Sequence, residues 1–201
     1  SQAATVAAHN SLGIGPIYYF GNEDQKEKYL PMLCTGKALW SFGLTEPNAG
    51  SDSDDLAGAS RIAPLAFFYR NDLNNLTTAA RAQTAVTHNN RQVIESAEFF
   101  GRVVWQVLHG ETPIAGIKQV LGEGFKRDPY DKWVTDGLNS VELDTRQAML
   151  DLGQMCEIEA AFPCVVHLIA KYEENLAEGL IENAMAGGDS AARGLIVGMI
   201  L

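Results

Sequence analysis

Apolar residues recur every three or four positions through most of the chain beyond residue 60, which is the spacing of helices with one buried face. Two of these stretches begin at side chains that can cap a helix, Asp72 in one case and Asn89 or Asn90 in the other. Gly110 is expected to end the second of these helices. Further helices are predicted over residues 113–121, 130–138, 145–152, 156–171 (interrupted by Pro163) and 174–186. The pattern therefore predicts an all-α helical bundle for the bulk of the chain.

Residues 1–55 have a different pattern of residue types. Residues 2–13 are rich in alanine and predict one helix. Residues 22–24 open a second helix, in which Pro31 breaks the regularity, and Gly36 ends this segment. Residues 39–44 are short and aromatic, as in a strand, and turn residues follow them. The acidic residues of the stretch 51–55 are interpreted as a solvated linker at the domain boundary. The prediction for this part is a short helix–helix–strand segment.

Charge and cysteine content exclude some classes of function. With 15 Lys and Arg against 25 Asp and Glu, the net charge is −10, which makes nucleic acid a poor partner. The longest apolar run, residues 195–201, is far too short to span a bilayer, so no membrane partner is expected. The three cysteines show no metal-type spacing and no signal peptide is visible, so a cytoplasmic location is expected.

The run Gly187-Gly188-Asp189 places a lone acid after two glycines, at the start of the last apolar helix. Glycines let a backbone approach a ligand closely, and free N–H groups converge at a helix N-terminus. This geometry suits a charged ligand or a metal ion. Asp189 could instead be a simple N-cap, and Arg193, four residues further on, could pair with it.

Four segments of residues 58–201 together carry a family resemblance. They are Gly58-Ala59-Ser60-Arg61-Ile62-Ala63-Pro64-Leu65, Thr87-His88-Asn89-Asn90, Cys156-Glu157-Ile158-Glu159-Ala160-Ala161-Phe162-Pro163 and Gly187-Gly188-Asp189. These segments resemble the C-terminal portion of an ADP-ribosylglycohydrolase. The resemblance implies an all-α fold and removal of ADP-ribose from a modified side chain, with two Mg²⁺ ions held by carboxylates and hydroxyls.

Carried over residue by residue, the resemblance makes Asp189 a metal ligand, while Ala191 and Ala192 stand where the family has a second Asp and a Thr. It also makes four residues candidates for substrate binding: Arg61, His88, Gly187 and Gly188. Arg61 could instead pair with an acid in the core, and His88 could be a structural, hydrogen-bonded histidine. No catalytic residue is assigned.

A second resemblance rests on three segments near the start of the chain: His9-Asn10-Ser11-Leu12-Gly13, Gly21-Asn22-Glu23-Asp24-Gln25-Lys26-Glu27-Lys28-Tyr29-Leu30-Pro31 and Phe42-Gly43-Leu44-Thr45-Glu46-Pro47-Asn48-Ala49-Gly50-Ser51-Asp52. They resemble the acyl-CoA dehydrogenases. The resemblance implies an FAD site in which Phe42, Leu44 and Thr45 contact the flavin ring and Gly50 and Ser51 lie near the acyl-CoA. The domain that supplies the glutamate base in that family is not recognisable in this sequence.

The sequence therefore predicts three parts: residues 1–54 as a fragment of acyl-CoA dehydrogenase type, residues 55–57 as a junction, and residues 58–201 as an incomplete ADP-ribosylglycohydrolase-like helical domain. The expected function is removal of ADP-ribosyl groups, in an incomplete or inactive form. The alternatives are an FAD oxidoreductase fragment and a helical scaffold without enzymatic function. The expected partners are ADP-ribose or an ADP-ribosylated protein, and self-association through residues 195–201 is a further hypothesis.

Overall fold

The computed structural model describes residues 14–35 and 54–201 of the chain. By its internal contacts the chain divides into two compact units, Ser1–Glu46 and Pro47–Leu201. Every regular element in the described residues is a helix, and the backbone pairing beyond the helices includes an isolated bridge between Asp55 and Glu157. The all-α prediction is confirmed. The helix predicted over residues 2–13 and the strand predicted over residues 39–44 lie outside the described residues.

The described part of the first unit consists of two helices, α2 (Gly15–Phe20) and α3 (Glu23–Cys34). Asn22 opens α3 through a reciprocal capping box, in which its side chain accepts from the Gln25 N–H and the Gln25 side chain accepts from the Asn22 N–H. Pro31 lies inside α3, which continues to Cys34, shortly before the end predicted at Gly36. The Thr35 hydroxyl donates to the Pro31 carbonyl at 2.7 Å, which satisfies one acceptor at the helix end.

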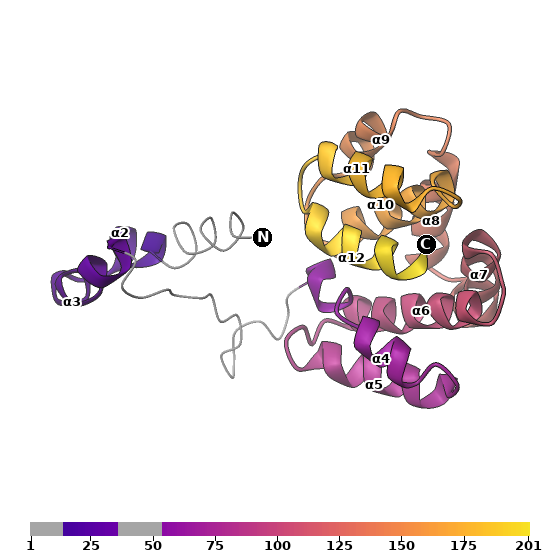
Figure 1. The fold of residues 1–201 in the computed structure, drawn as a ribbon, viewed down its shortest axis with the longest axis horizontal. Helices are drawn as coiled ribbons and strands as arrows, with labels where there is room; N and C mark the ends of the chain where they lie inside the picture. Colours follow the sequence, from indigo (N-terminus) through magenta and orange to yellow (C-terminus); the bar gives the residue numbers. More distant parts are fainter. Residues whose placement is uncertain (1–13, 36–53) are drawn as a thin grey trace. The chain divides into compact units, whose positions relative to one another are not determined.

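The second unit is a bundle around one central helix (Figure 1). Its elements are η2 (Leu56–Gly58), α4 (Ala63–Phe68), α5 (Leu73–Ala85), α6 (Arg91–Leu108), α7 (Pro113–Val120), η3 (Leu121–Phe125), α8 (Tyr130–Asn139), α9 (Thr145–Leu152), α10 (Ile158–Lys171), α11 (Leu176–Met185) and α12 (Ser190–Ile200). Helix α10 packs against α8, α9, α11 and α12, while α5 and α6 lie side by side with α4 against them. No helix in the described part has both the length and the apolar content to cross a membrane.

Side-chain caps set the starts of most helices in this unit. Asp72 caps α5 by accepting from the Asn75 N–H, and Asn90 caps α6 by accepting from the N–H groups of Gln92 and Val93. Both predicted starts are confirmed. Helix α9 has the predicted bounds, but α10 begins at Ile158 rather than at Cys156. Pro163 lies inside α10 without ending it.

The core lies along α10 and α6. Every residue from position 161 to position 169 is buried, so α10 is covered on all sides. Five aromatic rings from neighbouring elements stack edge to face or tilted against one another in this core: Phe99, Phe100, Phe162, Tyr130 and Trp133. His167 is fully buried on the same helix, and it hydrogen-bonds to Ser140 at the end of α8 and to Thr145 on α9.

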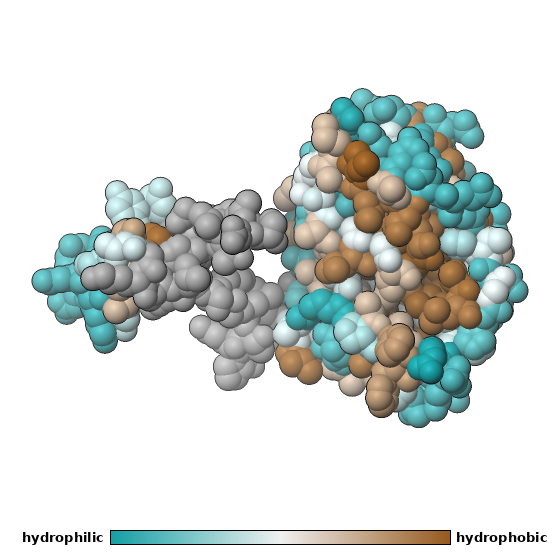
Figure 2. Space-filling view, in the orientation of Figure 1, coloured by the Kyte–Doolittle hydropathy of each residue, from teal (hydrophilic) through white to brown (hydrophobic). Residues whose placement is uncertain are grey.

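Apolar side chains also gather on one outer face of the bundle, over α11 and α12 (Figure 2). Ile181, Met185 and Leu195 are each more than half exposed there. The predicted interaction segment at residues 195–201 contributes less to this face than expected, because Ile196, Val197 and Ile200 are buried in the core. Self-association through this segment stays a prediction.

Candidate functional site

The candidate site is built around the turn between α11 and α12. Gly187 and Gly188 have φ values of +73° and +65°, in the left-handed region that favours glycine. A Cβ atom on Gly188 would lie 2.1 Å from the carbonyl oxygen of Gln154, so this position admits no side chain. The Asp189 N–H donates to the same carbonyl at 3.1 Å, and the Gln154 side chain donates to the Ala186 carbonyl. The turn is therefore clamped against Gln154.

Asp189 follows the glycines and caps α12. Its side chain accepts from the Ala192 N–H at 3.5 Å, which is long for a hydrogen bond of this kind. The capping role predicted from the sequence is thus present, and Asp189 is partly exposed. The role of Asp189 as a metal ligand stays a prediction.

Arg193 lies beneath the turn with no exposed surface. Its Nε donates to Asn183 at 2.9 Å, and its Nη2 donates to the Gly187 carbonyl at 2.5 Å. Its Nη1 is buried and has no hydrogen-bond partner among the described residues. Burial lowers the pKa of the guanidinium, while the proximity of Cys164 and Asp189 partly offsets this effect. The pairing predicted between Arg193 and Asp189 is therefore electrostatic and not a direct hydrogen bond.

The other two predicted substrate-binding side chains lie together. The Arg61 guanidinium donates to the Thr87 hydroxyl, which also hydrogen-bonds to Nδ1 of His88 at 2.8 Å. Arg61 is exposed and forms no ion pair within the described residues. The expected alternative, pairing of Arg61 with a core acid, is not what the structure shows.

His88 is buried at 3% exposure and packs on Gly58, where a Cβ atom would lie 2.5 Å from the His88 ring. Burial lowers the pKa of His88, Asp55 nearby raises it, and Arg61 lowers it. The ring is therefore neutral near pH 7. Its Nε2 is buried and has no partner among the described residues. The hydrogen bond to Thr87 fits a structural role, and the unpaired nitrogen leaves the binding role open.

Residues 154–157 connect these two groups of side chains. On one side, Gln154 holds the glycine turn, as described above. On the other side, the Cys156 carbonyl accepts from the Leu56 N–H at 2.9 Å, and the Ile158 N–H donates to the Asp54 carbonyl at 2.7 Å. Asp54 and Asp55 are thus part of the helical body, and their interpretation as a solvated linker is wrong. Segments far apart in the sequence meet at this one strip of backbone.

The backbone segment 154–157 has acidic surroundings. Burial and the neighbouring acids Asp55 and Glu157 raise the pKa of the Cys156 thiol to about 11, so this cysteine is an unreactive thiol near neutral pH. One carboxylate oxygen of Glu157 is buried without a hydrogen-bond partner among the described residues. Both features show that negative charge is concentrated where residues 54–58 meet residues 154–157.

A Mg²⁺ ion does not fit the described residues alone. Hard cations require several oxygen ligands, and within the described ranges no group of three or more His, Cys, Asp and Glu side chains could hold a metal ion. Ala191 and Ala192, which follow Asp189, have no ligating side-chain atom. The predicted flavin contacts cannot be placed either, since Phe42, Leu44, Thr45, Gly50 and Ser51 lie outside the described residues.

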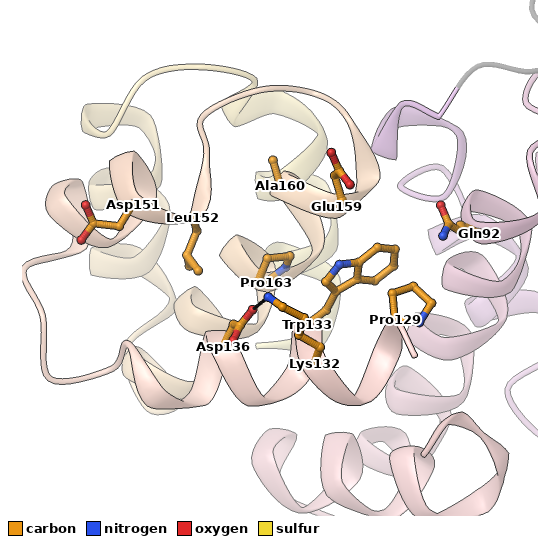
Figure 3. Close-up of a pocket in the computed structure, with 10 residues that line it drawn as sticks. All are labelled: Gln92, Pro129, Lys132, Trp133, Asp136, Asp151, Leu152, Glu159, Ala160 and Pro163. Atoms are coloured by element: carbon orange, nitrogen blue, oxygen red, sulfur yellow. Dashed lines mark hydrogen bonds and ion pairs between the residues drawn. The ribbon is translucent and has the colours of Figure 1, made fainter. Parts of the chain in front are cut away.

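A polar groove of about 480 Å³ lies beside the first turns of α10 (Figure 3). It is lined by residues of α6, α8, α9 and α10: Gln92, Pro129, Lys132, Trp133, Asp136, Asp151, Leu152, Glu159, Ala160 and Pro163. The sequence analysis missed this groove. Its lining comes from segments separated by tens of residues, and no local motif marks them.

Comparison with known proteins places the chain in a family. The profile of the ADP-ribosylglycohydrolases matches residues 8–201, which is nearly the whole chain. The chain therefore belongs to the ADP-ribosylglycohydrolase family. Its helical architecture agrees with the fold that the sequence predicted for that family. None of the solved structures matches the chain significantly.

The chain is also similar to acyl-CoA dehydrogenases. It is 35% identical over 151 residues to the probable acyl-CoA dehydrogenase YngJ of Bacillus subtilis (strain 168), covering 71% of the chain and 35% of that relative. An acyl-CoA dehydrogenase of the same organism is 53% identical over 51 residues, or 25% of the chain and 14% of that relative. The human mitochondrial very long-chain specific acyl-CoA dehydrogenase is 42% identical over 65 residues, or 32% of the chain and 10% of that relative.

The chain thus spans about a third or less of the length of these relatives. The family match leaves out only residues 1–7, so the two similarities overlap along the chain. Both resemblances found in the sequence are confirmed. The limits drawn between the parts, at residues 54 and 58, stay a prediction.

Proposed function

We propose that this chain is a hydrolase of the ADP-ribosylglycohydrolase type that retains binding of ADP-ribosyl groups and has weak or no hydrolytic activity. The observation that carries the proposal is the turn at residues 187–189. Two left-handed glycines, the N-terminus of α12 and the Asp189 carboxylate meet there, above a buried arginine. Membership of the family supplies the ligand class.

The chemistry of the turn suits a ribose diphosphate. A carboxylate can accept hydrogen bonds from two ribose hydroxyls, as acids do in dinucleotide sites. Backbone N–H groups at a helix N-terminus favour phosphate oxygens. Arg61 offers an exposed guanidinium that no carboxylate neutralises within the described residues, so it is the best candidate for a second phosphate contact. His88, held by Thr87 next to Arg61, would border the same ligand.

The weak hydrolysis follows from residues 191 and 192. Metal-assisted hydrolysis requires carboxylate or hydroxyl ligands in fixed positions, and alanine supplies neither. Asp189 is the lone carboxylate of the turn. We therefore infer that Mg²⁺ adds little to the affinity for ADP-ribose, and that ADP-ribosylated proteins are bound more readily than they are cleaved.

Thermal unfolding of the chain with ADP-ribose, with and without Mg²⁺, tests the proposal. A ligand that binds the folded state alone stabilises it by about 2.7 kcal/mol at a hundredfold excess over its dissociation constant, so the midpoint should rise. The shift should be nearly the same with Mg²⁺. An unchanged midpoint at high ADP-ribose would contradict binding, and a large additional shift with Mg²⁺ would contradict the inference about the metal.

The variant Asp189→Ala should lose most of the shift caused by ADP-ribose. Its matched control is Asp72→Ala, because Asp72 also caps a helix, α5, through a hydrogen bond to a backbone N–H. Both variants lose a cap, which costs about 1 kcal/mol of stability. Asp72→Ala should nevertheless keep the full ligand shift. Equal ligand shifts in the two variants would show that Asp189 does not contact the ligand.

The similarity to acyl-CoA dehydrogenases supports a second candidate function, binding of FAD as a fragment of such an oxidoreductase. Incubation with FAD followed by desalting tests it directly. Retained flavin absorbance at one equivalent per chain would favour this candidate. A colourless protein would exclude this candidate and leave two others, the hydrolase-type function and the predicted non-enzymatic scaffold. Thermal unfolding with ADP-ribose distinguishes these two, because a scaffold without a ligand should show no shift.

A further inference from the structure

The groove between α8 and α10 has the character of a second ligand site. Its floor is apolar and rigid, formed by the Trp133 ring, Pro129, Leu152 and Pro163 (Figure 3). Trp133 is held from behind by edge-to-face contact with Tyr130 and tilted contact with Phe162, each with ring centroids 5.3 Å apart. A volume of about 480 Å³ falls within the range of small-molecule pockets.

One donor in the groove makes no hydrogen bond within the described residues. The Trp133 side chain is largely buried, at 5% exposure, and its indole N–H is not enclosed by the protein but open to the groove. Figure 3 shows the indole nitrogen facing the groove beside Pro163. An indole N–H is a donor and cannot accept a hydrogen bond. A ligand that carries a carbonyl or similar acceptor would satisfy this one.

The charges of the lining favour a cation. The groove has one basic side chain, Lys132, and three acidic ones, Asp136, Asp151 and Glu159. Lys132 is paired with Asp136, as the dashed line in Figure 3 marks. Asp151 accepts a hydrogen bond from the neutral side chain of Gln147, and Glu159 has no ion-pair partner within the described residues. Two carboxylates are thus left without a basic partner.

Pro163 leaves the Glu159 carbonyl without its usual helical donor. Because it has no N–H, it cannot supply the donor that the Glu159 carbonyl would ordinarily receive within α10. The Glu159 carboxylate thus lines the groove next to a carbonyl that receives no N–H from position 163. All of these features point to the same class of ligand.

We propose that this groove binds an organic cation that also carries a carbonyl group, as an arginine residue in a peptide does. The guanidinium would be attracted by Glu159 and Asp151, and the carbonyl would accept from the Trp133 N–H. This site is separate from the turn at residues 187–189 and does not depend on the function proposed for it.

The probe that tests the site is N-acetyl-arginine amide, titrated at millimolar concentrations into ¹⁵N-labelled protein. The indole N–H resonance of Trp133 should shift and saturate, and the variant Trp133→Phe identifies this resonance among those of the three tryptophans. Trp105 should not respond. N-acetyl-citrulline amide, which is neutral and nearly the same shape, should bind at least about fivefold more weakly, as loss of one modest charge interaction implies.

Two further arms separate the parts of the proposal. Butylguanidine has the guanidinium without the carbonyl and without a second charge, and it should bind more weakly than the amide. Glu159→Gln should weaken binding of the arginine probe about fivefold, whereas Glu142→Gln, an exposed acid outside the groove, should leave it unchanged. Equal binding of the arginine and citrulline probes, or an unmoved Trp133 resonance, would overturn the proposal.

Discussion

The buried surroundings of His167 link the protonation of this residue to the stability of the fold. It is fully buried, its Nδ1 hydrogen-bonds to Ser140 at 2.8 Å, and its Nε2 lies 3.3 Å from the Thr145 hydroxyl. Thr145 in turn shares a hydrogen bond with Tyr172 at 2.7 Å. This network joins α8, α9 and α10 in the core. Burial, reinforced by Lys171, lowers the pKa of His167 to about 4.

We predict that this histidine makes the fold sensitive to acid. Below pH 6.5 the unfolded chain binds a proton at this residue and the folded chain does not, so stability falls as the pH drops from 6.5 towards 4. The loss reaches about 3 kcal/mol at the lower end. Urea unfolding at several pH values measures it. His167→Gln should flatten this part of the profile, whereas His109→Gln, at an exposed histidine, should not. Parallel profiles for the wild type and His167→Gln would contradict the prediction.

Local sequence predicted those elements whose ends depend on neighbouring residues. The caps Asp72 and Asn90 were identified because short polar side chains before an apolar stripe satisfy the first N–H groups of a helix. The predicted start of α10 is two residues too early, since Gln154, Cys156 and Ile158 form backbone hydrogen bonds. Their partners are Asp189, Leu56 and Asp54. Such distant pairing leaves no local pattern.

In the candidate site, too, local sequence marks some features and not others. The turn at residues 187–189 was recognisable because glycine pairs and a following acid are local signals. The burial of Arg193, the packing of His88 on Gly58 and the groove at Trp133 were not predictable, because each depends on how helices distant in sequence pack together. The sequence predicts an interruption at Pro163, but α10 continues through this proline despite the lost N–H group.

The connection between α11 and α12 allows a prediction at the level of elements. Gly188→Ala places a methyl group 2.1 Å from the Gln154 carbonyl and forces a left-handed φ on alanine, so it should cost about 3 kcal/mol or more. Gly198→Ala lies on α12 itself, where a Cβ atom meets nothing within 4 Å. It should be neutral or stabilising by up to about 1 kcal/mol. Denaturant unfolding compares the two variants, and similar stabilities would contradict the described geometry of the turn.

At the scale of the whole molecule, the main core is contained in the second unit. Its buried residues run from Leu56 to Ile200, within Pro47–Leu201. A unit with its own core can fold alone. We predict that residues 47–201, expressed separately, unfold cooperatively with nearly the midpoint of the full chain. A broad transition, or a midpoint lower by many degrees, would show that residues 1–46 are required for the stability of the bundle.

A family member with one acid at its C-terminal turn should still bind ADP-ribose. Calorimetric titration of ADP-ribose into the full chain, without added metal, measures this binding. We expect saturable binding at one site per chain, lost in Asp189→Ala and kept in Asp72→Ala. Absence of binding to the wild-type chain, with the protein folded in the same buffer, would contradict it.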